Sequence, residues 1–486
     1  MARHTLSSIC LLRLLWQVKS VVILVADGVR PDTLASAVAR GDVPAMAALS
    51  RDGSLSTVTA AFPSVTGVGY APFLLGRLPG PAGLPGLRWF DRCGSAWTPL
   101  GRSRSYVGIE MRYVDADLTP DAPTIFELVP DSLGSLSVIQ RGLAASRRVA
   151  RGAGFAARAA VTHFLGNLQG WLAIDRALAT TVARRIREER PAFTFAAFTG
   201  ADKVSHACGH DAPEVISALQ VIDDCVAEVR RDAERAGRWE NMHLWVVSDH
   251  GHSAVDGHDD LASWARALGI RTLAHPWVIR RAGRADLAVM PSGNAMAHLY
   301  VDLARKGRPW WGELEEQWGA FAGELIGRPS VDLLIVARSA GETEIRGAGR
   351  GVARIVRSGS RYSYRPVSGD PLGCGEVERA SPEHALAATL GTDYPDAIVQ
   401  IASLAGSARA GDIIVSARCG WDFRKRYEPI PHVSAHGGLH RDHMSVPLLT
   451  NRPTRSTPQR TVDVMPSALR ALDVALPPML DGYSFV

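Results

Sequence analysis

The chain has 486 residues, of which 46% are hydrophobic and 21% are charged. This composition excludes an intrinsically disordered chain, a collagen-like chain and a disulfide-stapled miniprotein. The net charge is +5, from 54 Lys and Arg residues against 49 Asp and Glu residues. Because these charges are spread along the chain without a long run of one sign, the sequence does not predict nucleic-acid binding through a basic face.

The N-terminal segment contains a short apolar stretch, residues 10–16, that Arg13 interrupts. It is shorter than the ~20 apolar residues of a transmembrane helix, and no small-residue cleavage site follows it before Val21. We therefore expect no transmembrane anchor and a cytoplasmic location, with an exported protein as the alternative. The six cysteines are scattered without C-x-x-C spacing, which favours reduced thiols over disulfides.

Three unbroken apolar runs each end near an acidic residue and a glycine. The runs are Val21–Ala26, Phe193–Phe198 and His243–Val247, and the acidic residues that follow them are Asp27, Asp202 and Asp249. Apolar runs of this length are typical of central strands covered on both faces. Ligands of open α/β sheets bind beyond the carboxyl ends of the strands, so we expect the three acidic residues to converge on one crevice.

Helical patterns separate these runs along the chain. They cover residues 171–187, 213–236, 260–268 and 311–326. The second pattern has Pro213 near its start and Gly237 at its end, which are typical helix boundary residues. The alternation of strands and helices predicts an α/β fold with a doubly wound, mostly parallel sheet and helices on both faces.

The regions between these patterns suggest how the chain is organised. We expect a catalytic domain over residues 20–486, with an insertion at 88–170 and an inserted cap lobe at 271–420. Gly76–Gly86 is rich in Pro and Gly and is predicted to be a loop, whereas Gly341–Ser360 is predicted to form exposed turns or hairpins.

Carboxylate and imidazole side chains accumulate directly after the predicted strands and in one later His-Gly-Gly sequence. The candidate metal ligands are, in chain order, Asp27, Asp202, His206, Asp249, His250 and His436. Zn²⁺ accepts His nitrogen and Asp oxygen, and six such ligands suit two ions that clamp the oxygens of a displacement at phosphorus. Mn²⁺ is an alternative because it accepts the same ligand types. Each motif alone also fits an ordinary turn or cap, but their joint placement favours a metal site.

A hydroxyl nucleophile is predicted within the sequence Phe62–Gly67. Thr66 is expected to begin a helix that runs through Leu75, where backbone N–H groups and the helix dipole favour a phosphate. A hydroxyl activated by a metal ion at this position is a competent nucleophile. The alternatives are that Thr66 is an ordinary helix cap and that Ser64 is the nucleophile.

Together these motifs resemble the alkaline phosphatase superfamily and, within it, the type I phosphodiesterase/nucleotide pyrophosphatase family. The resemblance depends on the sequences VADGVRPD (25–32), FPSVT (62–66), DKVSH (202–206), SDHGH (248–252) and AHGG (435–438). It implies an alkaline-phosphatase-like fold and a hydrolase of phosphodiester, pyrophosphate or phosphonate bonds that acts on a small-molecule phosphoester. It also implies that Thr66 attacks phosphorus and forms a phospho-threonine intermediate at a site with two zinc ions.

The resemblance also implies how the two ions are held. One ion would be bound by Asp27, Thr66, Asp249 and His250. The other ion would be bound by Asp202, His206 and His436.

The sequence departs from the family pattern where an asparagine commonly donates to a phosphate oxygen, because Gly69 stands there. Lys203 and His210 are candidate substrate-binding residues, with a solvated lysine and a structural histidine as the alternatives. His252 and His258 are also candidate substrate-binding residues, with a structural histidine as the alternative. His440 and His443 are alternatives to His436 as the last metal ligand.

Two other functions remain open at this point. Because Gly69 replaces the asparagine of the family pattern, hydrolysis of nucleotide diesters is less strongly indicated, and a phosphomonoesterase of the same superfamily is one alternative. A catalytically inactive relative that binds a ligand is the other. A sulfatase is excluded because the chain has no Cys-x-Pro-Ser-Arg motif. The sequence identifies neither the leaving group nor the oligomeric state.

Overall fold

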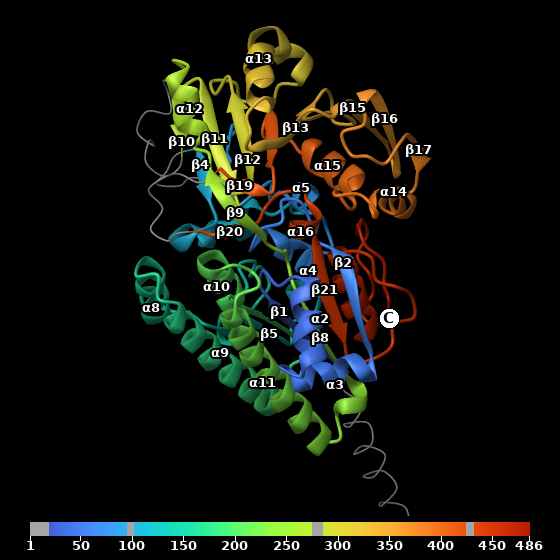
Figure 1. Cartoon of the computed structure of the whole chain (residues 1–486). Coiled ribbons are helices and arrows are strands. Elements are labelled where there is room, and N and C mark those ends of the chain that lie inside the picture. The colour runs from blue at the N-terminus through green and yellow to red at the C-terminus, as the bar shows by residue number, and fades with distance from the viewer. Residues whose placement is uncertain (1–18, 95–101, 275–284, 424–431) are drawn as a thin grey trace, which may run out of the picture.

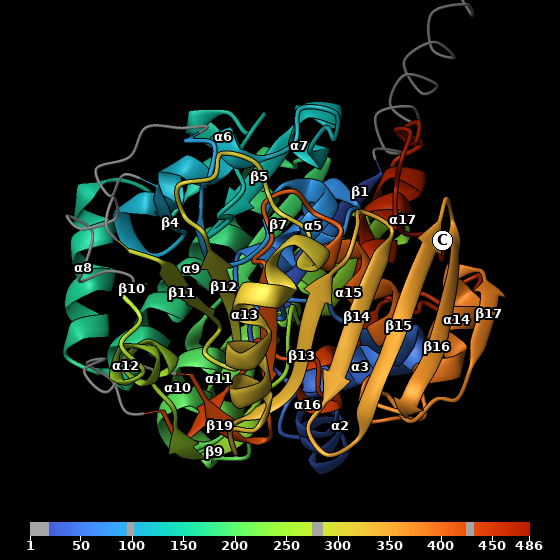
Figure 2. The ribbon, with the colours of Figure 1, turned by 90° about the horizontal axis from the view of Figure 1, so that it is seen from above.

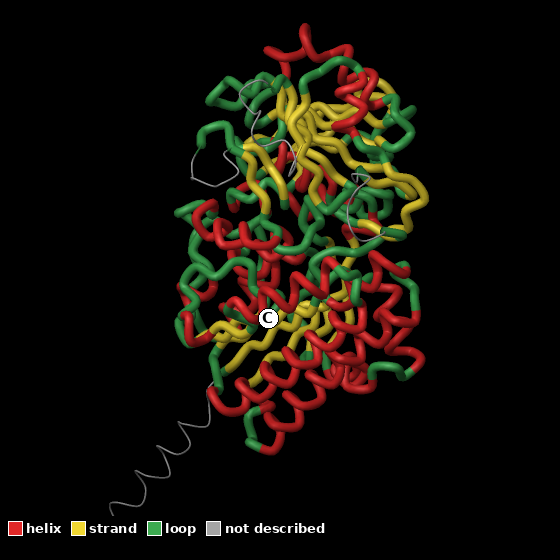
Figure 3. Tube along the Cα trace, turned by 90° about the vertical axis from the view of Figure 1, so that its left-hand side faces the viewer, coloured by secondary structure: helices red, strands yellow, loops and turns green. Residues whose placement is uncertain are grey.

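Two β-sheets in different halves of the molecule organise the chain (Figure 1). The structure is a computed structural model that describes residues 19–94, 102–274, 285–423 and 432–486. Figure 3 shows the same division, with the strands gathered in two separate groups. The apolar stretch at residues 10–16 lies outside the described residues.

The first sheet has seven strands in the order β2-β21-β8-β1-β7-β5-β6. Their bounds are β1 Ser20–Ala26, β2 Ser54–Thr59, β5 Ser132–Ser135, β6 Arg148–Val149, β7 Phe193–Phe198, β8 Met242–Val247 and β21 Ser445–Thr450. β1 pairs in parallel with β7 and β8, and β5 pairs in parallel with β7, whereas β21 runs antiparallel to β2 and β8. The predicted mostly parallel sheet is confirmed, and the three apolar runs are its central strands.

Helices cover both faces of this sheet. On one face lie α2 Pro31–Arg40, α3 Pro44–Asp52, α9 Leu168–Glu189, α10 Gly200–Cys208 and α11 Pro213–Arg235. On the other face lie α4 Ala71–Leu75, α7 Ile125–Leu128 and α17 Val464–Ala471. Alternate side chains of β1 divide between the two layers: Val22 and Leu24 pack with the first set, and Val21 and Ile23 with the second. Burial on both faces is why these strands are apolar without interruption.

The second sheet has nine strands in the order β10-β11-β12-β18-β13-β14-β15-β16-β17 (Figure 2). Their bounds are β10 Thr272–Ala274, β11 Leu287–Ser292, β12 Met296–Val301, β13 Val331–Ala337, β14 Glu342–Gly347, β15 Gly351–Ser358, β16 Arg361–Gly369, β17 Val377–Ala380 and β18 Ile413–Ala417. One face packs against α12 Leu261–Ala267 and α13 Trp311–Ile326, and the other against α14 Pro382–Thr389 and α15 Ala397–Ala405.

The regions expected to be insertions contribute differently to the two sheets. All nine strands of the second sheet fall within residues 271–420, and the hairpin β14–β15 lies where Gly341–Ser360 predicts one. Residues 88–170 hold the separate pair β3 Arg88–Phe90 and β4 Ser103–Ser105, but also β5 and β6 of the first sheet. The second half of that segment is therefore part of the main sheet, and the division into domains stays a prediction.

Two local expectations differ from the structure. Thr66 does not begin a continuous helix, because Gly67 has a φ of 84° and a 3₁₀ turn at Val68–Tyr70 precedes α4. The segment Gly76–Gly86 is not entirely loop, since it contains the short helix α5 Pro79–Ala82. Proline at the first helical position is compatible with such a turn because its missing N–H would be unpaired there anyway.

Two further properties bear on the sequence analysis. The described cysteines are all free: Cys93, Cys208, Cys225, Cys374 and Cys419. Among the described helices, none has the combination of length and apolar composition that crossing a bilayer requires.

A buried ion pair joins the C-terminal segment to the start of α15. The guanidinium of Arg460 donates to both oxygens of Asp396 at 2.6 and 2.8 Å, and the side chains are 4% and 0% exposed. Breaking such a pair leaves a buried charge uncompensated, which costs about 3–5 kcal/mol. We expect Arg460→Ala to lower the thermal unfolding midpoint by several degrees. Arg305→Ala, which removes solvent-exposed pairs, should barely change it, and equal shifts would contradict this assignment.

Candidate active site

Three buried carboxylates meet at the carboxyl edge of the first sheet. Asp27 directly follows β1, Asp202 lies in the first turn of α10 after β7, and Asp249 follows β8. The strands are in register at this edge, with Ala26 opposite Phe198. Each of the three carboxylates is at most 1% exposed. The structure thus brings together the acidic residues that the sequence places at the strand ends.

One group of side chains surrounds the hydroxyl of Thr66. Its Oγ1 donates to Oδ1 of Asp27 at 3.1 Å and lies 3.1 Å from Nε2 of His250. Nε2 of His250 is 3.2 Å from Oδ1 of Asp27 and 3.8 Å from Oδ2 of Asp249. The ligand atoms of Asp27, Asp249 and His250 all lie within 4.8 Å of one another. The hydroxyl therefore points at a compact set of oxygen and nitrogen donors.

The charges of this group are poorly compensated by the protein itself. Neither carboxylate oxygen of Asp249 has a hydrogen-bond partner among the described residues. Burial and the neighbouring Asp27 raise the pKa of Asp249 well above its ordinary value. Burial alone would lower the pKa of His250, but Asp249 and Asp27 outweigh it and raise that pKa to about 9. Buried carboxylates without partners are the environment in which a divalent cation is stabilising.

A second group gathers around Asp202. The residues whose ligand atoms lie within 4.8 Å of one another are Asp202, His250, His252 and His436. Oδ1 of Asp202 is 3.1 Å from Nε2 of His252 and 3.5 Å from Nε2 of His436. His206 lies beside this group, with its Nε2 3.3 Å from the same oxygen. Asp202 therefore faces three imidazoles at once.

His436 reaches this site through a small three-stranded sheet. The sheet is ordered β19-β9-β20, with β9 Ser253–His258, β19 Gly420–Asp422 and β20 Ser434–Ala435. Ala435 pairs antiparallel with Ser253, which brings His436 beside His252. Nδ1 of His436 donates to the carbonyl of Ser64 at 2.9 Å, which leaves Nε2 directed toward Asp202.

The two predicted substrate-binding residues occupy different surroundings. Nζ of Lys203 lies 2.8 Å from Oδ2 of Asp202. Burial would lower the pKa of Lys203, but the charge of Asp202 outweighs it and raises that pKa. His210 follows α10 and belongs to neither ligand group; burial and the charge of Arg30 lower its pKa. A substrate contact by either residue stays a prediction.

The alternatives considered for other positions can also be located. The hydroxyl of Ser64 donates to the carbonyl of Gly438 at 2.9 Å and not to the carboxylates. A Cβ atom at Gly69 would lie 3.3 Å from Cβ and the carbonyl oxygen of Asp249. This contact is tight, so an asparagine at position 69 would press on Asp249 in this backbone.

The remaining candidate histidines lie outside both ligand groups. Nδ1 of His258 is 2.7 Å from Asp422, and Nε2 of His443 is 2.7 Å from Oγ of Ser253. His440 lies instead with Cys419 and Asp442 in a partly exposed third set of donor atoms.

Asp175 is a neighbour of the site that the sequence analysis missed. It lies on α9, is 1% exposed, and its Oδ2 accepts from the backbone N–H of Gly200 at 2.7 Å. Its other oxygen has no hydrogen-bond partner among the described residues, and burial raises its pKa to about 7. The available signal was an acidic residue on the apolar face of an amphipathic helix, where a charge is unexpected.

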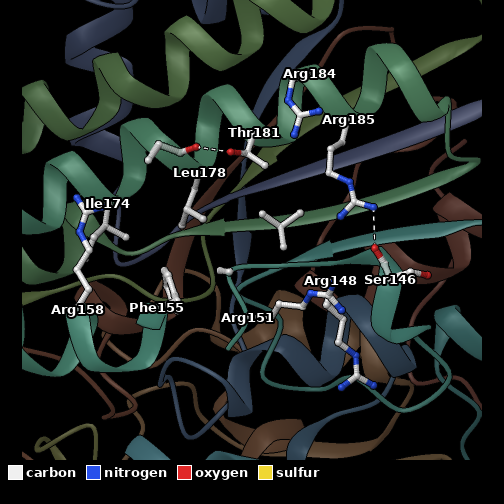
Figure 4. A pocket seen from close by; sticks show the side chains of 13 residues that line it. Ser146, Arg148, Arg151, Phe155, Arg158, Ile174, Leu178, Thr181, Arg184 and Arg185 are labelled. Atoms are coloured by element: carbon white, nitrogen blue, oxygen red, sulfur yellow. Dashed lines mark hydrogen bonds between the residues drawn. The ribbon is translucent and has the colours of Figure 1, made fainter. Parts of the chain in front are cut away.

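A cavity of about 520 Å³ lies elsewhere, between α9, the edge strand β6 and the helix α8 Ala153–Phe164 (Figure 4). Five arginines line it: Arg148, Arg151, Arg158, Arg184 and Arg185. None of the candidate ligands or Thr66 lines this cavity, so it is separate from the site described above.

The fold and the site define an α/β protein with buried carboxylates and imidazoles at the carboxyl edge of a mostly parallel sheet. The family model for type I phosphodiesterase / nucleotide pyrophosphatase matches residues 21–440. The chain therefore belongs to this family and is a phosphoester hydrolase. A comparison with curated proteins finds no match.

Solved structures share the fold over nearly the whole chain. Phosphonoacetate hydrolase from Sinorhizobium meliloti 1021, in complex with phosphonoformate, has a TM-score of 0.56 and 16% identity; the match covers 95% of this chain and 97% of that one. Murine ectonucleotide pyrophosphatase/phosphodiesterase 5, an inactive variant in complex with AMP, has a TM-score of 0.55 and 13% identity, with 96% and 97% covered. At such identities these likenesses show the fold alone.

Asp175 generates a prediction about pH. Because its folded pKa is raised from 3.8 to about 7, its ionisation opposes folding, so stability falls as the pH rises between these values and the loss is complete above them. We expect Asp175→Asn to remove this slope. In thermal melts with chelator present, the variant should unfold at a higher temperature than the wild type at pH 8 and at a similar temperature at pH 4. Parallel curves across this range would contradict the prediction.

Proposed function

We propose that the protein hydrolyses phosphodiester bonds, or the related pyrophosphate or phosphonate bonds, at two divalent metal ions with Thr66 as the nucleophile. The observation that carries this proposal is the contact of Oγ1 of Thr66 with both Asp27 and His250, at 3.1 Å each. Membership of the type I phosphodiesterase / nucleotide pyrophosphatase family supports the reaction class.

The donor set fits a pair of divalent cations. The unpartnered oxygens of Asp249 and the mixture of carboxylates and imidazoles suit Zn²⁺, with Mn²⁺ as the alternative. One ion would be held by Asp27, Thr66, Asp249 and His250, and the other by Asp202, His206 and His436. When bound, the ions supply positive charge against the anionic substrate and lower the pKa of nearby hydroxyl groups and water.

The chain's own residues position the displacement. Asp27 accepts the hydrogen bond of the Thr66 hydroxyl and so fixes the direction of Oγ1. Oγ1 attacks phosphorus and forms a phospho-threonine ester, while the bond to the leaving group breaks and the hydroxyl proton ends on the departing alcohol. Water then hydrolyses the phospho-threonine ester and restores the hydroxyl. One water molecule is consumed, and a phosphomonoester and an alcohol are released from a diester.

A phosphomonoesterase is the second candidate, and Gly69 favours it. With glycine there, no side chain at that position donates to a phosphate oxygen. A substrate panel separates the two: p-nitrophenyl phosphate, bis-p-nitrophenyl phosphate, thymidine 5′-monophosphate p-nitrophenyl ester and a p-nitrophenyl phosphonate ester, each with added Zn²⁺ or Mn²⁺. Preference for the diesters or the phosphonate supports the proposal, and preference for the monoester supports the second candidate. If none of the esters is turned over, the protein is instead a catalytically inactive relative that binds a ligand.

Removing the proposed nucleophile should abolish turnover. We expect Thr66→Ala to lower kcat by about a thousandfold or more, because the variant lacks the hydroxyl that forms the proposed covalent intermediate. Zinc content, measured by elemental analysis, should persist because Asp27, Asp249 and His250 remain. Ser64→Ala is the matched control, since its hydroxyl bonds to Gly438 and should be dispensable for turnover. Full activity of Thr66→Ala would remove the nucleophile assignment.

Asp249 links metal binding to stability. Its buried carboxylate has no partner without a cation, so Asp249→Asn should raise the thermal midpoint of the metal-free protein. Adding Zn²⁺ should stabilise the wild type strongly and the variant much less, because the stabilisation by a bound ligand grows with the logarithm of its affinity. Asp473→Asn, at an exposed carboxylate, should respond to zinc like the wild type. A zinc-induced shift of wild-type size in Asp249→Asn would exclude this residue as a ligand.

A further inference from the structure

His252 has no role in the proposed function, yet it lies in the middle of the second ligand group. Its side chain is 0% exposed, and its Nε2 is 3.1 Å from Oδ1 of Asp202. Its ligand atom also lies within 4.8 Å of those of His436 and His250. His206, which the family resemblance assigns as a ligand, is slightly farther from the same oxygen at 3.3 Å.

Gly28 leaves room for this imidazole, and Gly251 allows a close backbone approach beside it. A Cβ atom at Gly28 would come within 2.8 Å of Nε2 of His252, so the missing side chain leaves the space that the ring occupies. A Cβ atom at Gly251 would lie 2.1 Å from the carbonyl oxygen of Asp442. The backbone at Gly251, between His250 and His252, therefore packs directly against that of Asp442, and the ligand atoms of both imidazoles lie in the same group.

The other side of the ring is held by a hydroxyl. Nδ1 of His252 lies 3.0 Å from Oγ of Ser434, which is on β20 and paired with Ala254 of β9. A histidine that binds a metal through one ring nitrogen is usually hydrogen-bonded through the other, which fixes its orientation. Nδ1 is engaged by Ser434, so Nε2 is the nitrogen directed into the group.

Asp202 is oriented in a complementary way. Lys203 occupies Oδ2 at 2.8 Å, so Oδ1 is the oxygen that faces the imidazoles. Around that single oxygen lie Nε2 of His252 at 3.1 Å and Nε2 of His436 at 3.5 Å. The donor atoms converge from three separate elements: α10, the turn before β9, and the residue after β20.

We propose that His252 is a further protein ligand of the ion beside Asp202, which then has four protein ligands: Asp202, His206, His252 and His436. This inference rests on the proposed function, which places an ion there. Four nitrogen and oxygen donors complete the tetrahedral coordination that Zn²⁺ prefers and that is typical of tightly held ions. The ion beside Thr66 also has four protein ligands, but one of them is a neutral hydroxyl, which is a weaker donor than an imidazole, so the ion beside Asp202 is retained more strongly.

Competition with a chromophoric chelator tests the retention. Wild-type protein loaded with Zn²⁺ should release one equivalent readily and the second only at higher chelator concentration. His252→Gln should lower the affinity of the retained equivalent by about tenfold or more, as losses at metal-supporting residues do. His258→Gln is the control, because His258 lies on β9, bonds to Asp422 and belongs to neither group. Unfolding curves of the metal-free variants check that both remain folded.

Zinc X-ray absorption spectroscopy tests direct binding. The scattering of imidazole rings should correspond to four histidines per two zinc ions in the wild type and to three in His252→Gln. Ser434→Ala should keep four, with a lower affinity, because it removes the orienting hydrogen bond alone. If His252 only donates a hydrogen bond to Asp202, the wild type contains three ligating histidines and His252→Gln leaves that number unchanged, which would overturn the inference.

The possible failures are distinguishable. A wild type that binds two zinc ions, together with a His252→Gln variant of equal affinity and equal imidazole scattering, overturns this inference and leaves the proposed function standing. A wild type that binds neither Zn²⁺ nor Mn²⁺ overturns both.

Discussion

Three carboxylates held close together inside the protein, Asp27, Asp202 and Asp249, are the feature on which the rest of the site depends. Transferring a charge from water into a protein interior costs several kcal/mol per ion unless it is compensated. His250 and Lys203 offset part of this charge, but both oxygens of Asp249 lack a hydrogen-bond partner in the described part of the chain. The central strands are buried on both faces, and this packing holds the strand ends that carry the carboxylates in place.

The second sheet contributes to the site as well as covering it. The turn between β11 and β12 contacts the backbone of a candidate metal ligand, because the N–H of Ala295 donates to the carbonyl of His436 at 2.9 Å. The neighbouring Asn294 forms a parallel bridge with His436, and its side chain lies 3.0 Å from Nδ1 of His432. The position of one imidazole thus depends on the nine-stranded sheet, which couples the folding of that region to the ligand geometry.

Local sequence patterns predicted the parts of the site that follow directly from strands. Asp27 and Asp249 end long apolar runs, and the carboxyl ends of parallel strands share one edge. Contacts between distant segments leave no local periodicity, so the pairing of β20 with β9, which brings Ser434 to His252, was not predictable. β5 and β6 have four and two residues, too few to show a pattern, which is why residues 88–170 were expected to be an insertion.

The segment from Ser64 to Thr66 connects the two ligand groups. Its first residue faces the Asp202 side, where the carbonyl of Ser64 accepts from His436 and the hydroxyl donates to Gly438. Two residues later the hydroxyl of Thr66 faces the opposite side and bonds to Asp27. One short stretch of backbone therefore fixes both the orientation of an imidazole in one group and the direction of the hydroxyl in the other. The spacing between the two groups follows from this segment, so a displacement of its backbone would disturb both sides of the site together.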